Sequence, residues 1–515
     1  MIETNFRSKV KTVEELRAII GDRPRKKKVI MCHGTFDIVH PGHIRHLVYA
    51  KSKADILVAS LTSDRHIAKA NFRPYVPEQL RAMNLAVLEM VDYVIIDSEP
   101  KPLRNLELIQ PDFFAKGYEY VKGGMDPRTQ EELNILERFG GEFIYTPGDV
   151  VYSSSAIIES EPPDLSVEKL MVLLAGEQLG FDDLAKTVGN LEGIKVHVVG
   201  DTIVDSYTYT TLIGGNTKTP TFSVRFDRQL DYVGGAGIVA KHLRAAGADV
   251  TFTTVLGDDP LKEFVLDDLR AARVKVNAII DPTRPTTNKN AFIADNYRLL
   301  KVDKVDNRAI SDKIQHQIQD HVRATSAQTV VYSDFRHGIF NRNTIPPLTE
   351  ALPRDAYRVA DSQVASRWGN ILDFVGFDLI TPNEREVRFA LGDQDSVVRP
   401  LGLELYRQAR CKTLLLKMGR LGLIAYRSLP KADEDARAFF VLDSFAQNVV
   451  DPVGAGDALL AYATLSMVAT GNIVIASVLG SMAAAVECEH DGNIPVRREQ
   501  VLEKLEAVAR NAKLD

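Results

Sequence analysis

The chain has 515 residues, of which 45% are hydrophobic and 26% charged, and its formal net charge is −6. That length exceeds one ordinary hydrophobic core, so we expect two or three domains. The acidic balance excludes a generally basic nucleic-acid-binding protein, and no apolar run is long enough to span a bilayer, so we expect neither nucleic acid nor membrane as a partner. Three widely spaced cysteines, Cys32, Cys411 and Cys488, form no metal-binding or disulfide pattern. We therefore expect a reducing, cytoplasmic compartment.

Short apolar runs alternate with helical patterns in the first part of the chain. Strand-like runs lie at 28–34, 55–63, 92–97, 112–117 and 141–147, and helix-like runs at 41–54 and 77–90. This alternation predicts an α/β fold, with a parallel sheet covered on both faces.

A polar, proline-containing stretch, ESEPPDLS at 159–166, predicts a domain boundary. We expect a first domain at 1–160, a helical linker at 161–192 and a second α/β domain at 193–515. Within the second domain, YTYTTLIGG and PTFSVRFDRQLDYVGG are rich in β-branched and aromatic residues. They predict strands of a small separate sheet that projects from the main body.

The run CHGTFDIVHPGH, after the first strand, predicts an anion site. Pro41 suits the first position of a helix, which puts His40 near the N-cap and His43 in the first turn. Both imidazoles then lie beside unpaired backbone N–H groups at the positive end of the helix dipole. Gly34 lets the preceding loop approach the anion closely. Zinc is the alternative, but it needs further ligands, and none stands at a suitable spacing. Surface histidines on an ordinary turn are the third interpretation.

These residues resemble the signature of the cytidylyltransferase-like nucleotidyltransferases, whose fold is a Rossmann-like parallel sheet. RPYVPEQLR, AKGYEY and YSSSAII resemble later motifs of that family, with Glu119 in place of an Asp. The resemblance implies in-line attack by a sugar phosphate on the α-phosphorus of a nucleoside triphosphate, with His40 and His43 stabilising the phosphates as pyrophosphate leaves. The other implied nucleotide-binding residues are Gly34, Thr35, Phe36, Lys51 or Lys53, Arg81, Lys116, Ser153, Ser154 and Ser155.

Class I aminoacyl-tRNA synthetases share the His-x-Gly-His element. They also need a Lys-Met-Ser-Lys type of loop, and the nearest string, LKMGRLG at 416–422, lies in the other domain.

DPVGAGDALLAYA, at 451–463, is a glycine-rich turn that opens a helix. Gly454, Ala455 and Gly456 can present consecutive N–H groups to a phosphate. Asp457 follows them directly, where it could accept a proton from an attacking hydroxyl or simply complement the helix dipole.

The surrounding motifs resemble the ribokinase/PfkB sugar kinases, although Pro452 replaces a Thr in the late signature. YVGGAGIVAKHL, TPNEREV and GDTIVDSY resemble further motifs, in the family's order. The resemblance implies a ribokinase-like domain with a small β-lid that often builds a homodimer, and Asp457 as the catalytic base. It further implies an ATP site at Lys417, Gly419 and Gly422, with phosphate contacts at Gly454, Ala455 and Gly456. Sugar contacts are implied at Asp201, Asp205, Gly234 and Gly235, and support for Mg²⁺ at Asn383 and Glu386.

The pairing of these two domains resembles the bifunctional heptose 7-phosphate kinases/heptose 1-phosphate adenylyltransferases of ADP-heptose synthesis. RPTTNKNAFIADNYRLLKVD and YSDFRHG resemble stretches of that kinase, which implies substrate contacts at Lys289 and Asp334. The substrates would be a sugar phosphate and ATP, and a separate phosphatase would act between the two steps. Here the domain order is reversed, Ile238 replaces an Asn, and DSQ replaces Asp-Pro-Lys. Another sugar or CTP as nucleotidyl donor, or one inactive, regulatory domain, are the alternatives.

Overall fold

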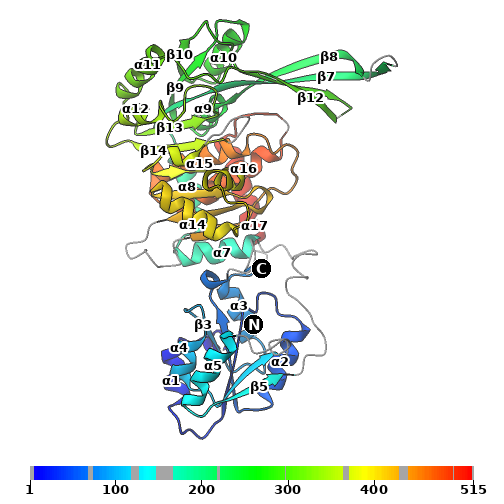
Figure 1. The fold of residues 1–515 in the computed structure, drawn as a ribbon, viewed down its shortest axis with the longest axis vertical. Helices are drawn as coiled ribbons and strands as arrows, with labels where there is room; N and C mark the ends of the chain where they lie inside the picture. Colours follow the sequence, from blue (N-terminus) through cyan, green and yellow to red (C-terminus); the bar gives the residue numbers. More distant parts are fainter. Residues whose placement is uncertain are drawn as a thin grey trace. The chain divides into compact units, whose positions relative to one another are not determined.

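The computed structural model describes residues 5–67, 74–117, 127–146, 166–216, 221–295, 297–363, 370–427, 439–490 and 492–512. Contacts divide the chain into two compact units, Met1–Leu165 and Ser166–Asp515. Each unit is described by itself (Figure 1).

The first unit is built on a five-stranded parallel sheet with the strand order β3-β2-β1-β4-β5. All five strands were expected from the apolar runs, and they are β1 (Val29–Gly34), β2 (Ile56–Thr62), β3 (Tyr93–Asp97), β4 (Phe113–Gly117) and β5 (Glu142–Thr146). Two apolar clusters cover the two faces of the sheet, around Leu47 and Leu85 on one face and around Leu16 and Leu106 on the other. The order reverses at β1, between β2 and β4, and such a switch point opens a crevice at the carboxyl ends of the strands.

Seven helical segments accompany this sheet in the described part of the first unit. The expected helices are α2 (Pro41–Lys51) and α3 (Glu78–Ala86), and the others are η1 (Asn5–Lys9), α1 (Val13–Ile20), η2 (Asp64–His66), α4 (Leu103–Ile109) and α5 (Pro127–Arg138). The last two were not expected. LRNLELI is only seven residues long, and PRTQEELNILER is mostly polar. Leu106 and Ile109 of α4 and Ile135 and Leu136 of α5 pack in the cluster on one face of the sheet.

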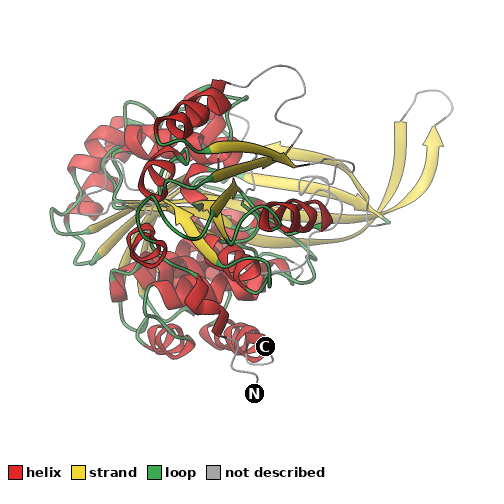
Figure 2. Ribbon diagram, turned by 90° about the horizontal axis from the view of Figure 1, so that it is seen from below, coloured by secondary structure: helices red, strands yellow, loops and turns green. Residues whose placement is uncertain are grey.

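The second unit contains a nine-stranded sheet of order β10-β9-β6-β13-β14-β15-β16-β17-β18. Its first seven strands are parallel, β17 pairs antiparallel with β16, and β18 pairs antiparallel with β17. Their bounds are β6 (Lys195–Gly200), β9 (Asp249–Leu256), β10 (Lys275–Ile280), β13 (Thr329–Asp334), β14 (Tyr357–Ser362), β15 (Leu379–Ile380), β16 (Thr413–Lys417), β17 (Leu423–Arg427) and β18 (Phe439–Leu442). Figure 2 shows helices on both sides of these strands.

Two long helices lie at the centre of this unit's core. α15 (Ala455–Thr470) and α16 (Ile473–Cys488) are buried over nearly their whole length, as their apolar composition requires. The remaining helices are α9 (Ala236–Ala245), α10 (Pro260–Ala271), α11 (Asp312–Arg323), α12 (Ile345–Glu350), α13 (Glu384–Leu391), α14 (Val398–Ala409) and α17 (Arg498–Ala512), with the short turns η4 (Ile371–Asp373) and η5 (Gly419–Leu421).

A separate four-stranded sheet, which we call the lid, has the order β12-β11-β7-β8. Its strands are β7 (Thr202–Asn216), β8 (Thr221–Gly235), β11 (Asn288–Ala294) and β12 (Tyr297–Lys304). β7 and β8 form the long ribbon that projects from the body in Figure 1 and Figure 2. The expected small second sheet is therefore present, although β11 and β12 were not assigned to it.

The stretch expected to be a helical linker is part of the second unit. α7 (Ser166–Gly176) and α8 (Phe181–Gly189) bury Leu170, Leu174 and Val188 in the same core cluster as α15 and α16. Residues 161–165 lie outside the described part of the chain. No helix in the described ranges is long and apolar enough to cross a membrane.

Candidate active sites

His40 and His43 lie at the crevice predicted for the first unit. His40 is the N-cap of α2, and its Nδ1 accepts a hydrogen bond from the Gly42 amide at 3.1 Å, while Pro41 takes the first helical position. The two imidazoles stack, with ring centroids 3.9 Å apart. Burial lowers the pKa of His43 to about 4, helped by the nearby His40 and His46, so this imidazole is neutral at pH 7. A hydrogen bond with the Ile38 backbone partly offsets this lowering of the His43 pKa.

The loop that precedes α2 contains a left-handed residue, Phe36, and a buried carboxylate, Asp37. Phe36 adopts a left-handed backbone (φ 48°), and its ring lies 5.1 Å from the His43 ring, centroid to centroid. The Asp37 carboxylate accepts hydrogen bonds from the amides of Tyr75 and Val76, both at 2.8 Å. Sequence reasoning did not assign this Asp, although its burial beside the signature histidines marks it as a positioning group.

Two of the expected phosphate ligands, Arg81 and Lys51, make contacts within the protein. Arg81 is fully buried and donates to the carbonyls of Val76, Thr35 and Thr62 and to the Asp64 carboxylate. Its guanidinium therefore fixes the loops that carry Thr35, Thr62 and Asp64.

Lys51 lies at the C-terminal end of α2, whereas His40 lies at the N-terminal end. It closes α2 and pairs with Asp92 at 2.5 Å and with the Asp55 carbonyl, both of which precede the sheet strands β3 and β2. An eleven-residue helix separates it from His40 by roughly 15 Å. Lys53, the alternative, stacks its ammonium 4.9 Å from the Tyr49 ring at the same end.

Lys116 is at the expected edge of the sheet. It ends β4, next to β1, and forms an ion pair with the nearly buried Glu132 of α5. The expected contacts at Ser153, Ser154 and Ser155 lie outside the described residues.

In the second unit, Asp457 lies in the first turn of α15, after the glycine turn. Gly454 is the N-cap with φ 89°, a left-handed backbone that favours glycine. The Asp457 side chain is 8% exposed, and its Oδ1 has no hydrogen-bond partner among the described residues. Burial raises the pKa of this carboxyl to about 8, assisted by the charge of Asp361 and opposed by Lys417. A carboxyl with these properties suits a general base.

Lys417 ends β16 beside the same helix start. Its Nζ donates to Asp361 Oδ1 at 3.0 Å, and a Cβ atom added at Gly456 would lie 3.3 Å from that Nζ. Burial alone would lower the pKa of this ammonium, but Asp361 and Glu386 outweigh burial and raise it. Lys417 is therefore charged where a phosphate would meet the α15 amides.

The neighbouring glycines shape the turn between β16 and β17. Gly419 has φ 60° and Gly422 has φ 88°, and a Cβ atom at Gly422 would lie 2.0 Å from the Leu442 carbonyl oxygen. These glycines are therefore required by the backbone turn itself.

Asn383 and Glu386, expected near Mg²⁺, form a capping box at the start of α13. The Asn383 side chain accepts from the Glu386 amide at 2.9 Å, and both Glu386 carboxylate oxygens accept from Asn383, at 2.7 and 2.8 Å. Within the described ranges, no three His, Cys, Asp or Glu side chains gather closely enough to hold a metal. Mg²⁺ in kinases keeps several waters and takes ligands from phosphates as well as one or two carboxylates. These residues fit such an ion only where a nucleotide supplies most of its ligands.

Three charged side chains form a row across the lid strands β7, β11 and β12. Asp205, Lys289 and Asp303 are directly paired across β7, β11 and β12, so their side chains share one face. Burial lowers the pKa of Lys289 and raises that of Asp205. A Cβ atom at Gly234 would lie 2.1 Å from Asp205 Oδ2, so this glycine makes room for the carboxylate.

The carboxylates of Asp201 and Asp334, which were expected to bind the sugar, form hydrogen bonds and an ion pair within the protein. The Asp201 carboxylate accepts from the amides of Phe335, His337 and Ile339, at 3.1 to 3.4 Å. Asp334 pairs with Arg336 at 2.7 Å and accepts from the Ser362 hydroxyl. Both carboxylates therefore position the loop after β13.

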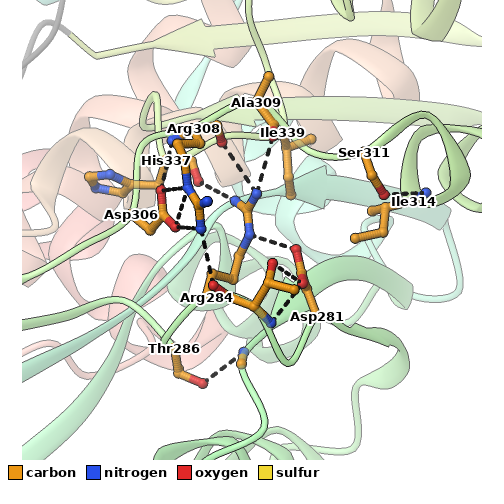
Figure 3. Close-up of polar contacts among 12 residues, drawn as sticks. Asp281, Arg284, Thr286, Asp306, Arg308, Ala309, Ser311, Ile314, His337 and Ile339 are labelled. Carbon is orange, nitrogen blue, oxygen red and sulfur yellow. Dashed lines mark hydrogen bonds and ion pairs between the residues drawn. The ribbon is translucent and has the colours of Figure 1, made fainter.

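Arg284, which precedes β11, contacts both the loop after β13 and the segment that follows β12. Its guanidinium binds Asp281 at 2.9 Å and donates to the carbonyls of His337, Arg308 and Ala309 (Figure 3). One of the substitutions noted in the sequence is Ile238, which stands where the resembled kinases have an Asn. Ile238 is fully buried in α9, so its side chain belongs to the core.

Two family comparisons agree with these two units. Residues 31–160 match the cytidylyltransferase-like family, and residues 194–499 match the pfkB family carbohydrate kinases.

Curated relatives carry the name bifunctional protein HldE. The protein from Geobacter metallireducens is 36% identical over 137 residues, which are 26% of this chain and 27% of the relative. The protein from Rhodopseudomonas palustris HaA2 is 26% identical over 334 residues, which are 63% of this chain and 65% of the relative. The chain thus covers less than two thirds of each. Phosphofructokinase-2 from Escherichia coli, solved with substrates and products, aligns with a TM-score of 0.51 at 16% identity, over 62% of this chain and 100% of that one. That likeness concerns the fold.

Proposed function

Since its pfkB match spans more than half of its length, the chain belongs to the pfkB family of carbohydrate kinases, and from this premise we propose a bifunctional enzyme of sugar-nucleotide synthesis. The second unit would phosphorylate a sugar at its anomeric hydroxyl with ATP. The first unit would join a sugar 1-phosphate to a nucleotide and release pyrophosphate. The observation that carries the proposal is the buried Asp457 carboxyl at the start of α15, whose Oδ1 has no hydrogen-bond partner among the described residues.

In the kinase step, the sugar hydroxyl attacks the γ-phosphorus of ATP, and the bond to ADP breaks. Asp457 accepts the hydroxyl proton. The amides of Gly454 to Gly456 and the Lys417 ammonium stabilise the charge of the transferring phosphoryl group. Asp205 and Lys289, on the lid face described above, would bind the sugar and its phosphate. Mg²⁺ would neutralise the ATP phosphates when bound with the nucleotide.

In the nucleotidyl transfer step, an oxygen of the sugar 1-phosphate attacks the α-phosphorus of the nucleotide, and pyrophosphate leaves. The α2 amides and the stacked His40 and His43 would bind the departing phosphates. A bound triphosphate raises the pKa of an adjacent imidazole. His43 can therefore gain a proton as negative charge accumulates.

We propose heptose 7-phosphate and ATP as substrates, and ADP-heptose as the product. Support comes from the motifs around Lys289 and Asp334 and from the relatives named HldE. A separate phosphatase would remove the 7-phosphate between the steps. Ile238 and Gln363 stand where the resembled kinases have an Asn and a Lys. The loss of an amide and of a cation favours a second candidate in which the sugar differs.

The lid supports a homodimer. Leu300 and Val302 on β12 alternate with the charged row, so they lie on its opposite face, and they are 52% and 50% exposed. Phe222 and Phe226 on β8 are 74% and 62% exposed. A second copy of this apolar surface would cover it.

Product analysis by mass spectrometry tests the proposal. With Mg²⁺, ATP and heptose 7-phosphate, we expect heptose 1,7-bisphosphate. With heptose 1-phosphate and ATP, we expect ADP-heptose and pyrophosphate. Phosphorylation of a different sugar, or transfer only from CTP, would select the second candidate. A chain that catalyses only one reaction on every sugar and nucleotide tried would show that its other domain is inactive.

A further inference from the structure

Three buried oxygen atoms without hydrogen-bond partners lie on residues around the start of α15. They are Asp457 Oδ1 of α15, Glu487 Oε1 of α16 and Asn493 Oδ1 of the following loop, and none has a hydrogen-bond partner among the described residues. Their side chains are 8%, 2% and 5% exposed. A Cβ atom at Gly454 would lie 2.8 Å from Glu487 Oε1 and 2.7 Å from Asn493 Oδ1. Glu487 and Asn493 therefore form one wall of the phosphate cradle.

The position of Glu487 has no evident structural benefit. It lies in the last turn of α16, where the helix dipole disfavours an anion, and no cation of the described chain pairs with it. A buried carboxyl without a cation or a full set of hydrogen bonds costs stability. Such a cost is typical of functional groups.

Asn493 lies near both Gly454 of the proposed phosphate contacts and Gly234 of the proposed sugar contacts. Its Nδ2 would lie 3.1 Å from a Cβ atom at Gly234, the glycine that makes room for Asp205. Glu487 thus borders the space between the proposed sugar contacts and the proposed phosphate contacts.

We propose that Glu487 is a positioning residue of the kinase reaction, which controls through its own charge whether Asp457 can accept the proton of the sugar hydroxyl. The inference rests on the proposed kinase activity. Two carboxyls that border one buried space titrate as a pair, because ionisation of one opposes ionisation of the other. While Glu487 holds its proton, Asp457 can ionise. When Glu487 ionises, its charge favours the protonated, inactive form of Asp457.

The electrostatics of the surroundings agree with this coupling. Burial, together with the charges of Asp457 and Asp451, raises the pKa of Glu487 to about 8, although a hydrogen bond from the Ile494 amide opposes this rise. From the other elements, Asp361 (β14), Lys417 (β16), Asp205 (β7) and Glu386 (α13) face Asp457. Lys417 is the cation in this set, and it already pairs with Asp361.

The test is Glu487→Gln, with Glu503→Gln, an exposed residue of α17, as the matched control. The pH dependence of kcat/KM for the sugar should shift its acidic limb by about half a unit toward lower pH in the Gln variant, because Asp457 loses an anionic neighbour. Glu503→Gln should follow the wild type. Glu487→Asp, which keeps the carboxyl, should restore part of the wild-type profile.

Thermal unfolding provides a second measurement without any substrate. The folded-state pKa of Glu487 lies above its unfolded value of about 4.5, so wild-type stability is lost as pH rises from that value through about 8. The melting temperature of Glu487→Gln relative to wild type should therefore increase across this range. Unshifted limbs together with a pH-independent difference in melting temperature would overturn the inference. A wild type that phosphorylates no sugar would instead refute the proposed function, while the melting curves still report on Glu487.

Discussion

Gly454→Ala is the substitution that most sharply separates backbone strain from packing at the proposed phosphate cradle. Gly454 has φ 89°, and an alanine in a left-handed backbone costs about 1–2 kcal/mol. Its Cβ atom would also approach Glu487 Oε1 and Asn493 Oδ1 to 2.8 and 2.7 Å, and overpacking of this kind adds about 1–3 kcal/mol. We expect a total loss of about 2–5 kcal/mol, with kinase activity reduced at least about tenfold because the cradle moves.

Gly471→Ala is the matched control at the other end of the same helix. Gly471 is the C-cap of α15 with φ 65°, and nothing lies within 4 Å of its added Cβ atom. It should cost only the backbone term, about 1–2 kcal/mol, and leave kinase kinetics unchanged. Hydrogen exchange of the α15 amides measures both losses. Equal losses in the two variants, with full kinase activity in Gly454→Ala, would refute the packed cradle.

The other predictions concern both units. Arg81→Ala should destabilise the first unit by about 3–5 kcal/mol in urea unfolding, because the variant loses the buried contacts to Thr35, Thr62 and Asp64. A loss of nucleotidyl transfer with unchanged stability would contradict the positioning role of Arg81. Lys51→Ala should change kcat of nucleotidyl transfer less than twofold, since its partly exposed ion pair with Asp92 is worth about 0–1 kcal/mol. A tenfold fall in kcat would show that Lys51 takes part in nucleotide binding. Leu300→Glu with Val302→Glu should weaken dimerisation at least about 100-fold in analytical ultracentrifugation, because each buried apolar side chain contributes about 1.5–3 kcal/mol. Val375→Glu, an exposed apolar residue outside the lid, is its control, and equal effects would exclude the lid as the interface.

Local sequence signals predicted those parts of the fold and site that depend on neighbouring residues. Pro41 after His40 specified the start of α2, and the glycine turn specified the start of α15, because both patterns act within one helical turn. The apolar runs located the strands of the first sheet. The order of those strands is a long-range property that these runs do not encode.

The roles of charged side chains were predicted less well than their places. Arg81, Asp201 and Asp334 all lie near the expected sites, yet they bind protein atoms. A motif gives the residue type, whereas its hydrogen-bond partners come from distant segments. Glu487 and Asn493 lie outside every motif, and only the fold brings them to Gly454.

The central claim is that each unit holds phosphoryl groups at the start of one helix and performs one reaction there. Parallel assays of sugar phosphorylation and nucleotidyl transfer in Asp457→Asn and His43→Ala test it most directly. We predict at least a 100-fold loss of phosphorylation alone in the first variant, and of nucleotidyl transfer alone in the second. If either variant kept both rates near those of the wild type, the account of that unit would be wrong.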